Sequence, residues 1–133
     1  MCFYLKKEKN KAFEQHIETT QQDLVVYKIL VPLKRKWWYL NKIFVSFFYG
    51  FEYKKGKIYQ IDSFGVEAYS TMFYEIYQGF HSYNSYEIAL RQPEFSGFHK
   101  SKIIKCIIPK GTKYLKNDTE IVSTAIKIIK CVK

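Results

Sequence analysis

Arginine is nearly absent from this basic sequence. Only Arg35 and Arg91 occur among its 22 basic residues, and 12 acidic residues leave a formal net charge of +10. The positive surplus favours anionic partners such as nucleic acid, an anionic membrane or an acidic protein surface. Arginine is the side chain best suited to bidentate contacts with guanine. Its scarcity therefore disfavours sequence-specific reading of bases.

Cysteine is also scarce, and its placement excludes the usual cysteine chemistry. Cys2, Cys106 and Cys131 are odd in number and widely spaced, which fits neither a disulfide framework nor a zinc pattern. The three histidines form no close ligand pair with them, so we expect no metal and no cofactor. Cys106 lies within the apolar run 103–108, where we expect a buried, inert thiol.

Long apolar runs are missing. The longest, Ile43 to Phe51, is interrupted by Ser46 and Gly50 and has about half the length of a membrane-spanning helix. The first seven residues do not resemble a secretory signal. We therefore expect a soluble protein in the cytoplasm, that of a bacterial host cell if the resemblance given below holds, with no membrane partner.

Charge is unevenly distributed along the chain. Residues 1–58 carry +7, residues 59–99 carry −4, and residues 100–133 carry +7. If the first and last segments pair in a sheet, they build one basic face and leave an acidic patch elsewhere. A surface with both signs suits a protein or ribonucleoprotein partner at least as well as bare nucleic acid. The alternative is that the lysines reflect coding composition and form a solvated surface.

The remaining pattern, rich in aromatic and β-branched residues, predicts an α+β fold: a single domain with a curved, mostly antiparallel sheet and one or two short helices. Residues 1–23 are polar and are expected to form an arm or a short helix, and residues 24–133 to form the domain. Strands are expected at 24–31, 57–61, 102–108, 121–122 and 125–132, with one or two more between 40 and 53.

Two helices are expected in the middle of the chain. Apolar positions between Val66 and Tyr77 follow a loose helical spacing that Gly79 could end. A second helix, Ser85 to Gln92, is indicated by a capping residue, a glutamate three positions later and a proline that follows.

The strongest candidate site combines basic and aromatic side chains. Lysine and arginine attract phosphate, and exposed aromatic rings stack on unpaired bases. The alternative is that the two neighbouring tryptophans point to opposite faces of a strand, so that at least one belongs to the core. The candidate residues for binding nucleic acid or another partner are Lys34, Arg35, Lys36, Trp37, Trp38, Lys42, Lys54, Lys55 and Lys57.

A weaker candidate is histidine chemistry at His81 and His99, which occur in similar Gly-Phe-His contexts. Two histidines can act as general base and acid in phosphodiester cleavage because their pKa values lie near neutrality. Two-histidine phosphoesterases carry His-x-Ser or His-x-Thr twice. His99 fits that pattern with Ser101, whereas His81 is followed by Ser82 and Tyr83. The alternative is a pair of histidines packed beside aromatic rings.

Three stretches of the chain carry a resemblance. The segments Gly50–Tyr59, Gly79–Tyr83 and Ile107–Tyr114 together resemble small phage and prophage proteins of unassigned function. The resemblance covers roughly residues 27 to 128 and implies a protein of a mobile element. Such small basic proteins often act by occluding host machinery.

A second resemblance is confined to Ile108–Tyr114, which is similar to a strand and turn near the end of ADP-ribosyltransferase domains. In that family a catalytic Glu-x-Glu lies just upstream, and the matching positions here are Ile103 and Lys105. The likeness implies a related fold and argues against that activity, since a lysine cannot stabilise a developing cation.

These observations lead to one leading functional hypothesis and two alternatives. The chain is expected to be a non-enzymatic inhibitor from a phage or mobile element that binds a host nuclease or ribonucleoprotein, such as an anti-CRISPR protein acting on guide RNA or its channel. The first alternative is a stand-alone RNA-binding module. The second is an enzyme, either ADP-ribosyltransferase-like or a histidine-dependent phosphodiesterase.

Overall fold

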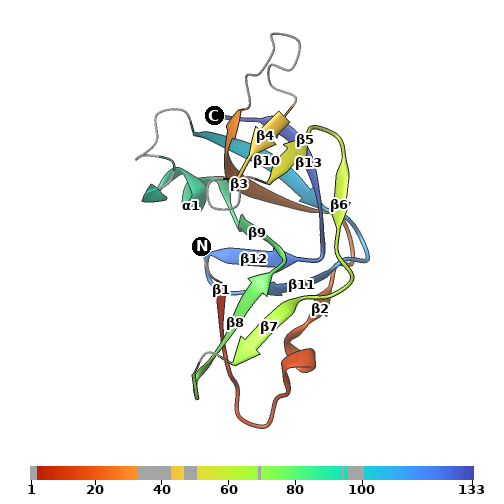
Figure 1. The fold of residues 1–133 in the computed structure, drawn as a ribbon, viewed down its shortest axis with the longest axis vertical. Helices are drawn as coiled ribbons and strands as arrows, with labels where there is room; N and C mark the ends of the chain where they lie inside the picture. The colour runs from red at the N-terminus through yellow and green to blue at the C-terminus, as the bar shows by residue number, and fades with distance from the viewer. Residues whose placement is uncertain (1–2, 33–42, 47–50, 69, 94, 96–100) are drawn as a thin grey trace.

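The chain folds into antiparallel β-sheet with one short α-helix. The computed structural model describes residues 3–32, 43–46, 51–68, 70–93, 95 and 101–133 (Figure 1). Within these residues all strand pairs are antiparallel, and the longer sheet runs from β2 at one edge to β6 at the other without closing. The mostly antiparallel sheet with a short helix that the sequence predicts is confirmed.

Two sheets contain the described strands. The longer sheet has the order β2-β11-β12-β9-β3-β10-β13-β6, with β4 paired to the end of β3 and β5 paired to β4, and the smaller sheet has the order β1-β8-β7. The strands are β1 Phe3–Lys6, β2 Glu18–Thr19, β3 Leu24–Pro32, β4 Ile43–Val45, β5 Glu52–Lys54, β6 Ile58–Gln60, β7 Gly65–Ala68, β8 Phe73–Gln78, β9 Phe80–Tyr83, β10 Lys102–Ile108, β11 Lys113–Lys116, β12 Glu120–Ser123 and β13 Ala125–Cys131.

The centre of the longer sheet is the pair β3 and β10. These β-branched strands pair along seven positions, from Leu24 opposite Ile108 to Leu30 opposite Lys102. Successive side chains of a strand point to opposite faces, so Ile104 and Cys106 enter the largest cluster of buried apolar residues. The predicted strands at 24–31, 57–61, 102–108, 121–122 and 125–132 are confirmed as β3, β6, β10, β12 and β13.

The opposite face of β3 and β10 is partly covered by the helix α1 (Tyr86–Leu90). Its first turn is capped by Ser85, whose Oγ accepts a hydrogen bond from the Ile88 N–H at 3.2 Å. Buried Ala89 packs with Ile29 and Ile103 of the two strands. The short helix predicted after residue 84 is therefore confirmed.

The helix predicted over residues 66–77 is wrong, because this segment forms the hairpin of β7 and β8. Val66 lies opposite Ile76, and β8 also pairs with β1 on its other side. Of the apolar residues that follow helical spacing, Ile76 is fully buried in β8, whereas Tyr77 is 58% exposed. Pairing with a strand some 70 residues earlier in the chain outweighs a loose local pattern.

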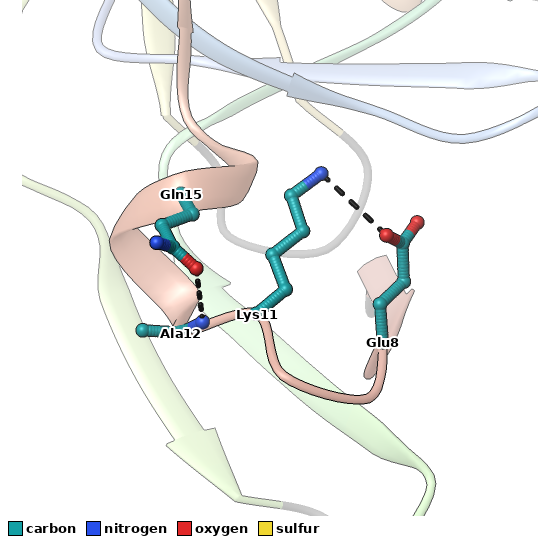
Figure 2. Close-up of polar contacts among 4 residues, drawn as sticks. All are labelled: Glu8, Lys11, Ala12 and Gln15. Carbon is teal, nitrogen blue, oxygen red and sulfur yellow. Dashed lines mark hydrogen bonds and ion pairs between the residues drawn. The ribbon is translucent and has the colours of Figure 1, made fainter.

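The residues before β3 contact both sheets. Strand β1 buries Phe3 and Leu5 against β8, and β2 pairs with β11. A 3₁₀ helix, Phe13–His16, connects them. Figure 2 shows its start, where the Ala12 N–H donates to Gln15 Oε1 at 2.8 Å and Lys11 Nζ lies 3.6 Å from Glu8 Oε2.

Candidate functional site

Two features of the described structure could support function. One is a lysine-rich surface formed by the outer face of β10 and β13 and by the turn before β6. The other is a cavity on the inner face of the longer sheet. The lysines that β10 and β13 contribute to this surface lie on the face of the sheet opposite the cavity.

The lysine-rich surface results from the alternation of side chains along β10 and β13 and from one β-bulge. On β10, buried Ile104 and Cys106 flank Lys105, whose side chain therefore faces outward. Its cross-strand partner on β13 is Lys130, while Ile107 lies opposite Lys127.

Lys127 and Lys130 are three positions apart, so strict alternation would place them on opposite faces. A β-bulge resolves this, since the register shifts between Lys105 and Cys106 and leaves Ile129 as the extra residue of β13. Both lysines therefore face the same side of the sheet.

A turn between β5 and β6 adds three lysines beside β13. The Gly56 N–H donates to the Ile128 carbonyl at 2.7 Å, which fixes the turn against the strand. Gly56 has φ +84, a left-handed conformation that glycine adopts without a Cβ penalty. Lys54, Lys55 and Lys57 are all exposed, and the Nζ of Lys57 lies 5.1 Å from the centroid of the Tyr59 ring. We call the set Lys54, Lys55, Lys57, Lys105, Lys127 and Lys130 the lysine face.

The lysine face has no internal charge compensation. Like charges directly opposite each other in a sheet repel, as Lys105 and Lys130 do. Among the described residues the ion pairs amount to the Lys11–Glu8 contact alone, so none of the six lysines has an acidic partner there. Apolar side chains lie among them: Ile58, opposite Lys127, is 51% exposed, and Val25, opposite Ile107, is 44% exposed.

The predicted binding residues divide into two groups. Lys54, Lys55 and Lys57 are described and belong to the lysine face. Three further lysines, on β10 and β13, were missed because their common facing depends on strand pairing and on the bulge. The other predicted residues, Lys34, Arg35, Lys36, Trp37, Trp38 and Lys42, lie outside the described residues.

The cavity has a volume of about 430 Å³ and lies between β3, β9 and the segment of β5 and β6. Aromatic rings form much of its wall. Tyr53 lies 5.2 Å from Tyr59 and 6.4 Å from Phe80, measured between ring centroids, and Phe51 lies 4.8 Å from Tyr53. Phe51 is 44% exposed, so the cavity reaches the surface.

Lys28 places a charge at this wall. Its side chain is only 8% exposed, because β3 directs it toward the same face as Val26 and Leu30. Its Nζ donates a hydrogen bond to the His81 carbonyl and lies 5.3 Å above the Tyr53 ring. Burial lowers the pKa of Lys28 from 10.5 to about 8, and neighbouring Cys106 opposes this change.

The neighbours of Lys28 are also shifted toward their neutral forms. Burial raises the pKa of Tyr53 above its usual value of 10.0. For His81, burial first and then the charge of Lys28 lower the pKa to about 4, so the imidazole is neutral at pH 7. Its Nδ1 is buried without a hydrogen-bond partner, and its ring lies 6.2 Å from that of Phe3.

Among the described residues, no catalytic site is assembled that would support the enzymatic alternatives. His81 lies on β9 with its ring packed beside Phe3, while His99 is outside the described residues. Ile103, at one of the positions matched to the Glu-x-Glu motif, is fully buried. Within the described part of the chain, no three His, Cys, Asp or Glu side chains come together as metal ligands. Among those residues, too, there is no helix with the length and apolar character to cross a membrane.

Comparison of this chain with protein-family models, with curated proteins and with solved structures finds no match. The lysine face and the cavity are therefore the features of this chain that bear on its function.

Proposed function

We propose that this protein acts without catalysis, as an inhibitor from a phage or mobile element that binds the RNA of a host ribonucleoprotein or nuclease. An anti-CRISPR protein acting on guide RNA or its channel is the specific form of this proposal. The resemblance to small phage proteins supports the origin, and the lysine face supports the mode of binding.

The observation that carries the proposal is the uncompensated charge of the lysine face. Three lysines share the outer face of β10 and β13 and three more lie in the turn beside β13, and none of the six has an acidic partner among the described residues. Their charge would be neutralised by phosphates, and the release of counterions from RNA would drive binding. Lysine contacts phosphate as a point charge and reads no base, which agrees with a partner recognised by shape and charge.

The apolar side chains within this surface favour RNA that is held in a particular shape over an extended polyanion. Val25, Ile107, Lys127 and Ile58 form one row across four strands. A partner that covers this row would remove exposed apolar area from water as well as neutralise charge.

The test is a fluorescence-anisotropy titration of a structured guide RNA and of a charge-matched duplex DNA over a series of salt concentrations. The variant Lys105→Gln/Lys127→Gln/Lys130→Gln removes half of the lysine face. Each lost phosphate contact lowers the salt slope by about 0.7 for single-stranded nucleic acid, so we expect a decrease of about 2.

The matched control is Lys110→Gln/Lys113→Gln/Lys116→Gln, which removes the same charge from exposed lysines at and before β11. We expect the control to retain most of the affinity of the unmodified protein. Equal losses in both triple variants would reduce the interaction to general attraction by net charge and would overturn the proposal. Replacement of Lys34, Arg35, Lys36 and Lys42 by glutamate tests the predicted residues outside the described part.

The stand-alone RNA-binding module remains a second candidate, and the same surface supports it. The inhibitor and the RNA-binding module differ in the partner that they bind. Equal affinity for free RNA and for the assembled ribonucleoprotein, with no inhibition of its activity, would favour the module.

A further inference from the structure

The cavity has the properties of a binding site for a small molecule, and this inference does not depend on the lysine face. Its volume of about 430 Å³ falls in the range of sites for small molecules, about 300–1,000 Å³. Such sites combine apolar and aromatic walls with a few polar groups that fix orientation. The wall here fits this description, with Lys28 as the buried cation.

The aromatic rings determine the shape that the cavity accepts. Phe51, Tyr53, Tyr59 and Phe80 meet one another edge to face or tilted, with centroids 4.8–6.5 Å apart. Rings in this arrangement present both faces and edges to a guest, which favours a flat aromatic molecule over a branched aliphatic one.

The charge of Lys28 determines the chemical group that this molecule should carry. A buried ammonium is costly unless an anion lies close to it. The Glu120 carboxylate also lines the cavity but forms no ion pair with Lys28, and the Lys28 Nζ contacts the His81 carbonyl and the Tyr53 ring. Both lie at the cavity wall, so a guest in the cavity reaches the ammonium group.

We propose that the cavity binds a planar aromatic monocarboxylate, with the rings of the ligand against the wall formed by Phe51, Tyr53, Tyr59 and Phe80 and its carboxylate against Lys28 Nζ. One ammonium group matches one carboxylate. The flat shape places that carboxylate at the wall while the rings fill the apolar part. The protein would therefore bind a small acid on the face of the sheet opposite the lysine face.

The test compares 2-naphthoate with 2-naphthalenemethanol, its uncharged counterpart, by calorimetric titration of the full chain. We expect naphthoate to bind about tenfold or more tightly than the alcohol, because only the acid pairs with Lys28. In Lys28→Met this preference should disappear, while affinity for the alcohol stays within about threefold.

Lys105→Met serves as the matched control, since Lys105 lies on the adjacent strand and faces the other side of the sheet. This variant should keep the preference for naphthoate. Equal binding of acid and alcohol to the unmodified protein, or a preserved preference in Lys28→Met, would overturn the proposal.

Amide chemical shifts of the unmodified protein provide a second test that does not depend on the folding of a variant. Naphthoate should shift the amides of lining residues such as Ile61, Gly79 and Phe80 and leave those of Lys127 and Lys130 unchanged. Shifts confined to the lysine face would show surface ion pairing and would contradict a site in the cavity.

Discussion

Cys106 and Lys28 illustrate at the scale of the residue what the sequence reveals and what it does not. The apolar neighbours of Cys106 predict a buried thiol, and the side chain is fully buried, with burial raising its pKa to about 12. Lys28 stands in an equally apolar strand, where a lone lysine would be assigned to the solvent-facing side. Its burial depends on β9 and on Tyr53, which are 25 or more residues away. The local sequence pattern is enough to predict the burial of Cys106, whereas the burial of Lys28 depends on tertiary packing.

Acidification should weaken the fold through His81. Its pKa is about 4 in the folded protein and near 6.5 when the chain is unfolded, so the unfolded state takes up a proton first as the pH falls. The stability that neutral His81 contributes is complete above pH 6.5 and is lost toward pH 4, by about 3 kcal/mol. Urea unfolding followed by tyrosine and tryptophan fluorescence at several pH values measures this loss.

The variant His81→Leu isolates the contribution of the imidazole. It removes the titrating group and the unpartnered Nδ1 at one position. The free energy of unfolding should then change less between pH 6.5 and 4 than in the unmodified protein. An unchanged pH dependence in this variant would assign the acid sensitivity to other groups.

At the scale of the element, the junction of β8 and β9 depends on a glycine. Gly79 lies between the two strands with φ +156, and a Cβ there would overlap the side chain of Val122 on β12. Gly56, in the turn between β5 and β6, also has a positive φ, but a Cβ would meet nothing within 4 Å. The two glycines therefore separate steric overlap from backbone strain.

Gly79→Ala should destabilise the protein by about 2–4 kcal/mol, because overlap in a packed region adds to the strain. Gly56→Ala should cost about 1 kcal/mol from strain alone. Chemical denaturation of the two variants measures the difference. Equal losses would mean that Val122 moves aside without cost.

The elements that the sequence predicts correctly are those whose signals are local. Strand β3 is rich in β-branched residues, and α1 has its cap and its following proline. The hairpin of β7 and β8 was missed because its strand character comes from pairing with β1. Half of the lysine face was missed for the same reason, since the common facing of Lys127 and Lys130 is created by a bulge between β10 and β13.

At the scale of the whole molecule, the charge pattern of the sequence becomes a spatial one. Strand β3 from the first basic segment pairs with β10 from the last, and both segments contribute to the lysine face. The acidic middle segment supplies the hairpin of the smaller sheet, where Glu67 lies directly opposite Glu75. Like charges are therefore paired in both sheets, and the net charge of +10 adds a general repulsion.

This repulsion predicts that salt stabilises the protein. Raising sodium chloride screens the paired lysines and glutamates, and we expect a gain of about 1 kcal/mol, or about 4 °C in Tm. The measurement is thermal unfolding by circular dichroism at low and moderate salt.

The triple variant Lys105→Gln/Lys127→Gln/Lys130→Gln should gain less from salt than the unmodified protein, because part of the repulsion is already removed. A Tm that falls as salt is added would contradict the prediction and would mean that attractive ion pairs dominate.

The bulge in β13 has a consequence for how the two faces of the sheet are kept apart. In a regular strand, the two isoleucines between Lys127 and Lys130 would put the second lysine out of phase, on the side of the cavity. The extra residue corrects the phase at one point, so one length of chain presents charge outward on both sides of the defect. An irregularity of a single residue thus allows a charged outer surface and an apolar interior to share the same strand.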